Sequence, residues 1–284
     1  MPVPRVVAVL SSAGGRLVPA DTPILRADDL GVLRGDGIFE TLHVRAGEPW
    51  LLDEHLARMR RSAQRLALAL PPAGALAELV ALACGAWSPE VEGTLRLVCT
   101  RGPDGADSPT VYATVGPVGE AIRRGRREGV RVVTATLAVP AQGRTGAPWL
   151  LGGAKTLSYA VNMASLRWAA EQGADDALWV STDGYVLEAP TATLVWLDGD
   201  TLCTVPSEPT AILAGITART LLAAAGGLGW RTAERFVTPA ELHSTGGVWL
   251  TSSVRGVAEI RTIDGVPLPP STETGRISKV LGFA

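Results

Sequence analysis

The stretch GGAKTLSY, residues 152–159, joins a glycine-rich loop to a run of helical character and carries one lysine. The basic residues of the chain are almost all arginines, and the only other lysine is Lys279. Small and apolar neighbours favour a partly desolvated amine, and the neutral amine is the form that attacks a carbonyl. Lys155 is therefore the candidate nucleophile. On spacing alone, a helix-start lysine that points into water stays open as the ordinary alternative.

The pair Lys155-Thr156 also ends a phosphate-binding loop motif. That motif needs a glycine directly before the lysine and another at a fixed distance upstream. Here Ala154 precedes the lysine, and no glycine stands at the required upstream distance. The stretch is therefore not such a loop.

Composition restricts the class of protein. The 284 residues are 46% hydrophobic and 19% charged, enough for one large or two modest globular domains. A net charge of -2 argues against nucleic acid or a membrane surface as partner, because both need a basic face, and leaves small polar substrates open. The three cysteines are widely spaced, which predicts neither a disulfide framework nor a metal site and fits a cytoplasmic location. Neither residues 6–10 nor 66–87 resemble a signal peptide or a membrane span.

The first part of the chain predicts a small α+β unit. We expect strands over residues 5–10, 37–44, 93–100 and 110–115, and a second helix over 73–85. The strand at 37–44 has two faces: Ile38, Glu40, Leu42 and Val44 share one, and Phe39, Thr41 and His43 share the other. The second face suits a cleft, although a half-exposed surface strand explains it nearly as well.

A first helix is expected after Asp53, which would cap it. Its apolar stripe consists of Leu56, Met59, Ala63 and Leu66, at three- and four-residue spacing. Three arginines, at 58, 61 and 65, lie off that stripe. Periodicity gives no reason to prefer one of the three arginines. A solvated helix face is the ordinary interpretation of all of them.

Residues 119–130 are charged and interrupted by glycine, which predicts a connection to a second unit. That unit is expected to open with a strand at 131–139 and to continue through Lys155 into a helix ending near 172. Short strands at 177–180, 185–189, 193–197 and 201–205 predict an antiparallel meander, and residues 248–251 a further strand. The turn Gly215-Ile216-Thr217 begins a helical run and offers an anion site, and residues 238–241 fit a capping box.

At this point the sequence resembles a known family, the fold-type IV pyridoxal-phosphate (PLP) enzymes. These include branched-chain aminotransferase, D-amino acid aminotransferase and 4-amino-4-deoxychorismate lyase. The resemblance covers nearly the whole chain and rests on the order and spacing of six pieces: RGDGIFET (34–41), EHLAR (54–58), Lys155, GYVLE (184–188), GITAR (215–219) and TSS (251–253).

The resemblance implies a role for each matched residue. Lys155 would bind the cofactor covalently and then act as the acid and base on the substrate carbon. Glu188 would pair with the protonated pyridine nitrogen, which keeps the ring an electron sink. Four residues would bind the phosphate: Arg58, Ile216, Thr217 and Ser253. The family pattern thus selects Arg58 where periodicity does not.

The family fold would be a two-domain α+β structure with the cofactor in the cleft between a small sandwich-like domain and a larger pseudo-barrel domain. We place these domains at residues 1–118 and 131–284, joined by the connection at 119–130. A homodimer interface would lie beside the cofactor. No partner other than a small-molecule amino substrate is expected.

Two departures from the family bear on the activity. Leu30 stands where the family has an arginine after Asp29, and the loop 101–109 lacks the Arg-x-His carboxylate trap of D-amino acid aminotransferase. The run after Lys155 and the pair Arg101-Gly102 look most like the lyase-type members. The predicted activity is therefore 4-amino-4-deoxychorismate lyase. A branched-chain or D-amino acid aminotransferase is the alternative, and a non-catalytic family member is a second one. Five residues are candidates for the substrate pocket: Phe39, Thr41, His43, Arg101 and Arg255.

Overall fold

The computed structural model describes residues 5–283. The chain divides into two compact units, which are described separately below. Unit 1 consists of Met1–Gly119 together with Ala154–Tyr159, and unit 2 of Glu120–Gly153 together with Ala160–Ala284. The chain therefore passes from unit 1 to unit 2, returns for one short segment that contains Lys155, and leaves again.

Unit 1 is built on a six-stranded antiparallel sheet in the order β2-β1-β6-β5-β3-β4. The strands are β1 (Val6–Ser11), β2 (Gly14–Val18), β3 (Gly37–Arg45), β4 (Glu48–Pro49), β5 (Gly93–Thr100) and β6 (Thr110–Pro117). The four strands expected from the sequence are all present. The hairpin partner β2 and the short β4 were not foreseen.

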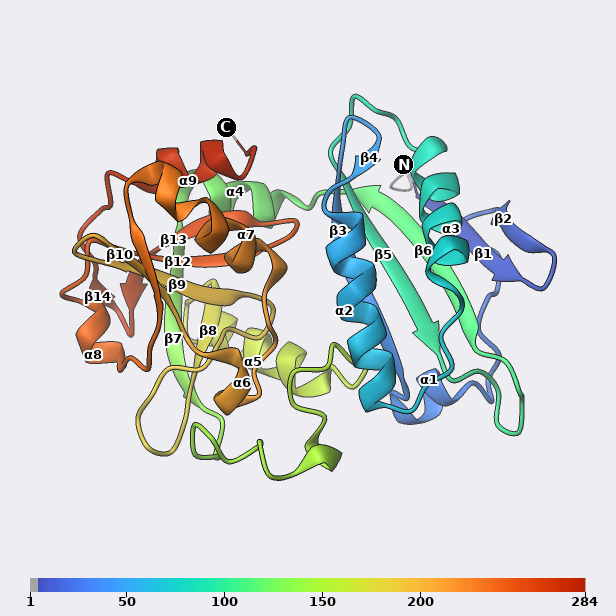
Figure 1. Cartoon of the computed structure of the whole chain (residues 1–284), viewed down its shortest axis with the longest axis horizontal. Helices are drawn as coiled ribbons and strands as arrows, with labels where there is room; N and C mark the ends of the chain where they lie inside the picture. Colours follow the sequence, from blue (N-terminus) through green and yellow to red (C-terminus); the bar gives the residue numbers. More distant parts are fainter. Residues whose placement is uncertain (1–4, 284) are drawn as a thin grey trace. The chain divides into compact units, whose positions relative to one another are not determined.

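Helices α2 (Leu52–Arg65) and α3 (Ala73–Gly85) pack on one face of this sheet, as Figure 1 shows. The apolar stripe of α2 meets Ile38, Leu42 and Val44 of β3 in the core, which confirms the inner face expected for that strand. The expected cap is wrong: α2 begins after Leu51, with no side-chain cap, and Asp53 lies inside its first turn. There the carboxylate still interacts favourably with the helix dipole. The short helix α1 (Leu30–Arg34) is capped by Asp29.

The segment Ala154–Tyr159 lies along the edge of β3. Thr156 bridges to Ile38, the Phe39 N–H donates to the Lys155 carbonyl (3.2 Å), and the Leu157 N–H donates to the Gly37 carbonyl (2.8 Å). Gly37 permits this approach, because a Cβ there would stand 2.6 Å from Leu157 Cδ1. Lys155 thus lies outside any helix or strand, and the helix expected to follow it, α5 (Ala160–Glu171), starts five residues later.

Unit 2 contains a mixed sheet in the order β11-β10-β9-β12-β13-β7-β8, with β14 paired to β13. Its strands are β7 (Val130–Thr136), β8 (Asp176–Val180), β9 (Thr193–Asp198), β10 (Thr201–Thr204), β11 (Arg231–Glu234), β12 (Gly247–Ser252), β13 (Gly256–Ile263) and β14 (Val266–Pro267). Of the expected meander, only the antiparallel pair of β9 and β10 is formed. β8 runs parallel to β7 at the sheet edge, far from β9 in the strand order, and residues 185–189 make only isolated bridges.

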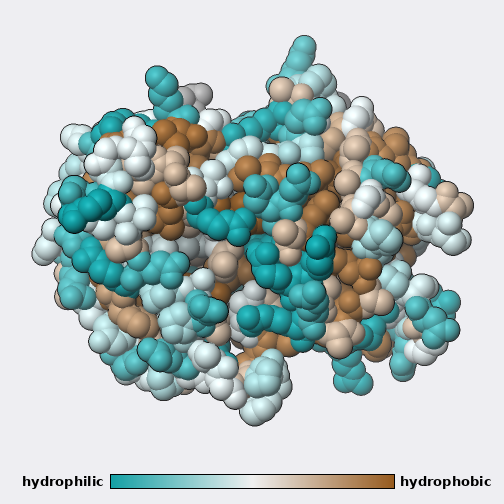
Figure 2. Space-filling view, in the orientation of Figure 1, coloured by the Kyte–Doolittle hydropathy of each residue, from teal (hydrophilic) through white to brown (hydrophobic). Residues whose placement is uncertain are grey.

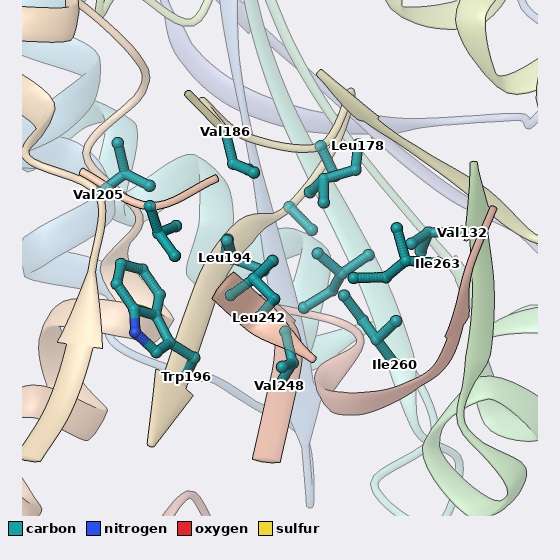
Figure 3. Close-up of a cluster of buried hydrophobic side chains, with 14 of the residues drawn as sticks. Val132, Leu178, Val186, Leu194, Trp196, Val205, Leu242, Val248, Ile260 and Ile263 are labelled. Atoms are coloured by element: carbon teal, nitrogen blue, oxygen red, sulfur yellow. The ribbon is translucent and has the colours of Figure 1, made fainter. Parts of the chain in front are cut away.

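The helical elements of unit 2 are α4 (Glu120–Glu128), α5, α6 (Ser207–Thr210), α7 (Ile216–Ala224), α8 (Pro239–Leu242) and α9 (Thr274–Val280), with 3-10 turns η1 (Pro148–Leu150) and η2 (Ala225–Leu228). Residues 119–130, expected to be a connection, therefore contain helix α4. The capping box predicted before α8 is formed by Thr238 and Glu241. Figure 3 shows the core, where side chains from β7, β8, β9, β12 and β13 point toward one another.

Figure 2 shows hydrophilic and hydrophobic residues interspersed over the face of the molecule in view. Such a mixture is ordinary for a folded protein, since much of any protein surface is apolar. Within residues 5–283, no helix is both long and apolar enough to cross a membrane.

Candidate functional site

The main chain of Lys155 is held in unit 1 by two hydrogen bonds. Its N–H donates to Ser62 Oγ on α2 (3.0 Å), and its carbonyl accepts from Phe39 on β3. The side chain is half-buried beside two aromatic rings: Nζ lies 4.3 Å from the centroid of Phe39 and 5.4 Å from that of Tyr159. The two rings themselves meet edge to face at 5.2 Å. The backbone bonds and the rings together fix where the amine stands.

Helix α2 separates Arg58 from the other arginines that the sequence left equivalent. Arg58 is buried (6% exposed) on the side of the helix that faces β3, whereas Arg61 and Arg65 are exposed. Its guanidinium bonds the carboxylate of Glu40, with Nε to Oε1 at 2.9 Å and Nη2 to Oε2 at 2.7 Å. The selection of Arg58 by the family pattern therefore coincides with a distinct environment in the fold.

In unit 2, Glu188 follows β8 and is positioned by main-chain bonds. The Trp179 N–H donates to the Glu188 carbonyl (2.9 Å). The Glu188 carboxylate is half-buried and accepts from the Leu213 N–H at Oε2 (3.2 Å). A carboxylate fixed in this way can hold a proton on a partner nitrogen without changing its own position.

The N-terminus of α7 lies in the same unit and has the features of an anion site. The helix starts after Gly215, which provides no side-chain cap, so the Ile216 and Thr217 amides belong to the turn whose N–H groups have no acceptor within the helix. A Cβ on Gly215 would collide with Thr193 Oγ1, so only glycine lets the helix start here. The Thr217 hydroxyl is buried, yet it has no hydrogen-bond partner among residues 5–283. Buried hydroxyls normally have a hydrogen-bond partner, so this one is a candidate contact for a bound anion.

Ser253 is buried in the turn after β12. Arg126 of α4 stabilises this turn, because its guanidinium donates to the Val254 carbonyl and to the Arg255 carbonyl (3.2 Å). The same guanidinium stacks over Phe283 at 4.7 Å. The position of Ser253 thus depends on a helix that the sequence suggested was only a connection.

The other candidate residues divide into two groups. Phe39 contacts Lys155, and Thr41 lies on the same strand face, directly across from Arg96 of β5. Arg101, by contrast, bonds Asp36 through Nε (2.6 Å) and Nη2 (3.1 Å) and also donates to two carbonyls at the end of α2. This pairing fastens α2 to the start of β3.

Arg255 and His43 also have partners inside the fold. The Arg255 guanidinium pairs with the fully buried Asp176 of β8 at 2.8 Å. The buried His43 accepts from Arg45 Nε at Nδ1 (2.7 Å), and its Nε2 lies 3.0 Å from Glu92. These contacts account for both residues without a substrate, so the interpretation of Arg101, Arg255 and His43 as pocket residues gains no support.

The arrangement suits an aldehyde cofactor that carries a phosphate. A lysine amine fixed in position, a carboxylate for a ring nitrogen, and a helix N-terminus with an unsatisfied hydroxyl are the groups that PLP requires. Within residues 5–283, no three His, Cys, Asp or Glu side chains are grouped to hold a metal ion. The fold and these residue types are those that a PLP enzyme of the two-domain α+β type uses.

The comparisons with known proteins agree. Residues 37–263 match the model of the family described as amino-transferase class IV. The chain is 43% identical over 263 residues to a bifunctional aminodeoxychorismate lyase / D-amino acid transaminase of Mycobacterium tuberculosis, covering 90% of this chain and 91% of that one. Among solved structures, it resembles the PLP-bound form of a hypothetical aminotransferase from the same organism (40% identity, TM-score 0.93, covering 98% and 97% of the two chains).

It also resembles the 4-amino-4-deoxychorismate lyase of Pseudomonas aeruginosa (29% identity, TM-score 0.78, covering 93% and 95% of the two chains). The chain therefore belongs to the class IV aminotransferase family. It is an enzyme of this family and uses PLP. The fold class expected from the sequence is confirmed.

Sequence reasoning missed several residues that the structure brings together. Ser62 accepts a hydrogen bond from the Lys155 main chain, Glu40 accepts from Arg58, and His55 bonds the other side of Glu40. One pattern was available for Glu40: it is a charged residue on the apolar face of a strand, between Ile38 and Leu42. A carboxylate in that position must have a buried partner. The partner itself could not be named, because it lies 18 residues away on another element.

Proposed function

We propose that this enzyme converts 4-amino-4-deoxychorismate into pyruvate and 4-aminobenzoate, and that it transaminates D-amino acids as a second activity. The observation that carries the proposal is the 43% identity, over nine tenths of the chain, to a relative named for both activities. The likeness to the lyase of Pseudomonas aeruginosa supports the first of them.

We assign the roles as follows. Lys155 binds the cofactor through Nζ and, once the substrate amine has displaced it, takes the proton from the carbon that bears the nitrogen. Glu188 keeps the ring nitrogen protonated, and when bound, PLP supplies the ring that accepts the electron pair left on that carbon. Arg58, the Ile216 and Thr217 amides, the Thr217 hydroxyl and Ser253 hold the phosphate.

The two activities share these first steps and differ afterwards. In the lyase reaction the electron pair would expel the enolpyruvyl group as an enolate when its C–O bond breaks. The six-membered ring becomes aromatic, and the enolate takes up a proton to give pyruvate. An amino acid has no such leaving group, so Lys155 would deliver the proton to the cofactor instead. Water would then release the keto acid, and the amino group would stay with the cofactor until a second keto acid takes it up. The substrate that fits therefore decides the product.

Substrate recognition is proposed to involve the outer face of β3 and β5. Phe39 lies beside Lys155, and Arg96 is exposed with its guanidinium 5.4 Å from the same ring. A cation there suits a carboxylate of the substrate. The chain lacks the Arg-x-His trap, so D-amino acids would depend on a different cation, for which Arg96 is the candidate.

Oligomeric state and location are part of the proposal. The family resemblance supports a homodimer, and light scattering of the purified enzyme tests it. Three unpaired, buried cysteines fit a reducing cytoplasm. The domain bounds expected from the sequence, 1–118 and 131–284, are likewise proposed.

One set of assays tests the function. The enzyme is supplied with 4-amino-4-deoxychorismate made by a coupled synthase and, separately, with L- and D-amino acids plus 2-oxoglutarate or pyruvate. We expect 4-aminobenzoate from the first and slower keto-acid exchange with D-amino acids from the second. Keto-acid exchange with D-amino acids but no 4-aminobenzoate would refute the lyase activity and leave only the aminotransferase activity. Exchange with branched-chain L-amino acids alone would overturn both proposed activities.

A further inference from the structure

Unit 1 contains a buried cluster of three ionisable residues, Glu40, His55 and Arg58. Glu40 projects from the inner face of β3, while His55 and Arg58 lie one turn apart on the facing side of α2. Besides the Arg58 fork described above, His55 Nδ1 lies 2.7 Å from Glu40 Oε2. Glu40 and His55 are fully buried. A carboxylate in such a place persists only if its partners compensate for lost hydration.

The charge state of the cluster follows from its contacts. Burial raises the pKa of the Glu40 carboxyl, but the charge and hydrogen bonds of Arg58 and the hydrogen bond of His55 outweigh it and bring the value to about 2. Burial lowers the pKa of His55, against the opposing effect of Glu40, so its ring is neutral at pH 7 and donates from Nδ1. The negative charge of Glu40 thus cancels the positive charge of Arg58. Net charge alone does not make this cluster attract an anion.

What the cluster does provide is orientation. The fork uses Nε and Nη2, which lie along one edge of the planar guanidinium, and two bonds along an edge prevent the plane from rotating. The remaining N–H directions of Arg58 are then fixed as well. Pre-set donors bind a ligand more tightly than mobile ones, because less conformational entropy is lost on binding.

We propose that Glu40 is a positioning residue, which aims the Arg58 guanidinium at the phosphate of the cofactor, with His55 holding the carboxylate from its other side. This inference rests on the phosphate role proposed for Arg58. The effect that it predicts for phosphate binding is opposite to the effect that charge alone predicts. If charge dominated, removing the Glu40 carboxylate would tighten phosphate binding, whereas loss of orientation weakens it.

Glu40→Gln separates these effects. The Gln oxygen can still accept one bond from Arg58, but its NH2 group then meets the second guanidinium donor, so the fork cannot form. His55 can adapt by changing its tautomer. The variant therefore keeps the shape and removes both the charge and the second bond.

The measurement is the dissociation constant of the apoenzyme for PLP and, in parallel, for pyridoxal, which lacks the phosphate. Glu40→Gln should weaken PLP binding about tenfold, the equivalent of one lost charge-assisted hydrogen bond, and leave pyridoxal binding unchanged. In an Arg58→Ala background, the same change should have no further effect on PLP. Glu259→Gln is the matched control: Glu259 is a buried carboxylate in unit 2 that pairs with Arg261 at 2.7 Å, and its loss should alter neither constant.

The outcomes separate the inference from its premise. If Arg58→Ala, compared with Arg61→Ala and Arg65→Ala, does not weaken PLP selectively over pyridoxal, the phosphate role of Arg58 is wrong. If it does, but Glu40→Gln leaves PLP binding unchanged or tightens it, Glu40 is not a positioning residue. Should Glu40→Gln not fold, Glu40→Asp keeps the charge and moves the carboxylate. A PLP-selective loss in that variant supports positioning. Unchanged PLP binding, or an equal fold-loss for PLP and pyridoxal, refutes it.

Discussion

In unit 1, the buried polar groups Glu40, His55 and Arg58 bond to one another, whereas in unit 2 the equally buried Thr217 hydroxyl has no partner among the residues that the structure describes. The first group is satisfied by the fold itself. The second has no partner among the described residues, and we propose that the phosphate of the cofactor provides one. Both are proposed to meet the same phosphate, so the comparison separates two ways of preparing a binding site.

The difference has a thermodynamic consequence. Changes to the unit 1 cluster should cost stability in the empty protein, because they break bonds that are already made. A change to Thr217 should cost only binding. Lys155 and Glu188 resemble neither case, because main-chain hydrogen bonds hold both residues and the proposed roles of their side chains are chemical. Four experiments test this division.

Lys155→Ala should have the largest effect. Its main-chain bonds to Ser62 and Phe39 do not involve the side chain, so the segment should stay in place and the unfolding midpoint should change little. Turnover should fall by a factor on the order of 10⁴, as for other covalent nucleophiles. Borohydride reduction followed by peptide mapping checks it: cofactor should be found on Lys155 in the wild type and on no peptide of the variant. Labelling of Lys279 would refute the assignment.

Glu188→Gln should lower kcat by roughly 10²–10³-fold while cofactor binding stays nearly unchanged. The Gln oxygen can still accept from Leu213, so the shape is kept and only the charge that holds the ring proton is lost. Steady-state kinetics and a cofactor titration measure the two quantities. An unchanged kcat would show that Glu188 does not pair with the ring.

Acid should act on unit 1 through Glu40. The unfolded carboxyl titrates near 4.5 and the folded one near 2, so the unfolded state binds more protons between these values. The stability from this group is complete above about pH 4.5 and is lost as pH falls toward 2, a change of up to about 3 kcal/mol. His55 adds a loss in the same direction below pH 6.5, because its pKa is lowered in the fold. Urea unfolding from pH 7 to 3 should therefore show a steeper decline in the wild type than in Glu40→Gln. Parallel stability curves for the two proteins would show that ionised Glu40 does not contribute to the pH dependence.

Thr217→Val should have the smallest effect and the most telling one. The methyl group fills the space of the hydroxyl and removes a buried, unsatisfied polar atom, so the apoenzyme should become more stable by about 1 kcal/mol. Cofactor binding should weaken about tenfold. Thermal unfolding with and without PLP gives both numbers. A destabilised apoenzyme would mean that the hydroxyl is already bonded, and the contrast with unit 1 would fail.

The sequence predicted local features well and long-range pairing poorly. The helix at Ala73–Gly85 and the strand at Gly93–Thr100 lie where apolar periodicity placed them, because each is decided by neighbours a few residues apart. The parallel pairing of β7 with β8 was missed, since a strand run gives no sign of its partner. Residues 185–189 have the composition of a strand but make only isolated bridges.

For the candidate site, the residue types were available and the partners were not. The resemblance selected Arg58 and Lys155, and their surroundings fit the proposed roles. Arg101 and Arg255 were candidates for the substrate pocket, yet each pairs with a carboxylate of the protein itself, Asp36 and Asp176 respectively. A single sequence cannot distinguish an arginine that awaits a substrate from one that is already paired.

The return of the chain to unit 1 also affects its synthesis. Residues up to 119 leave the ribosome first, but the segment that covers the edge of β3 follows about 40 residues later. At roughly 5–20 residues per second, that edge stays uncovered for about 2 to 8 seconds. An unpaired strand edge can recruit other chains. During that interval the nascent protein exposes the strand edge that the Lys155 segment later covers, and another chain can pair with it.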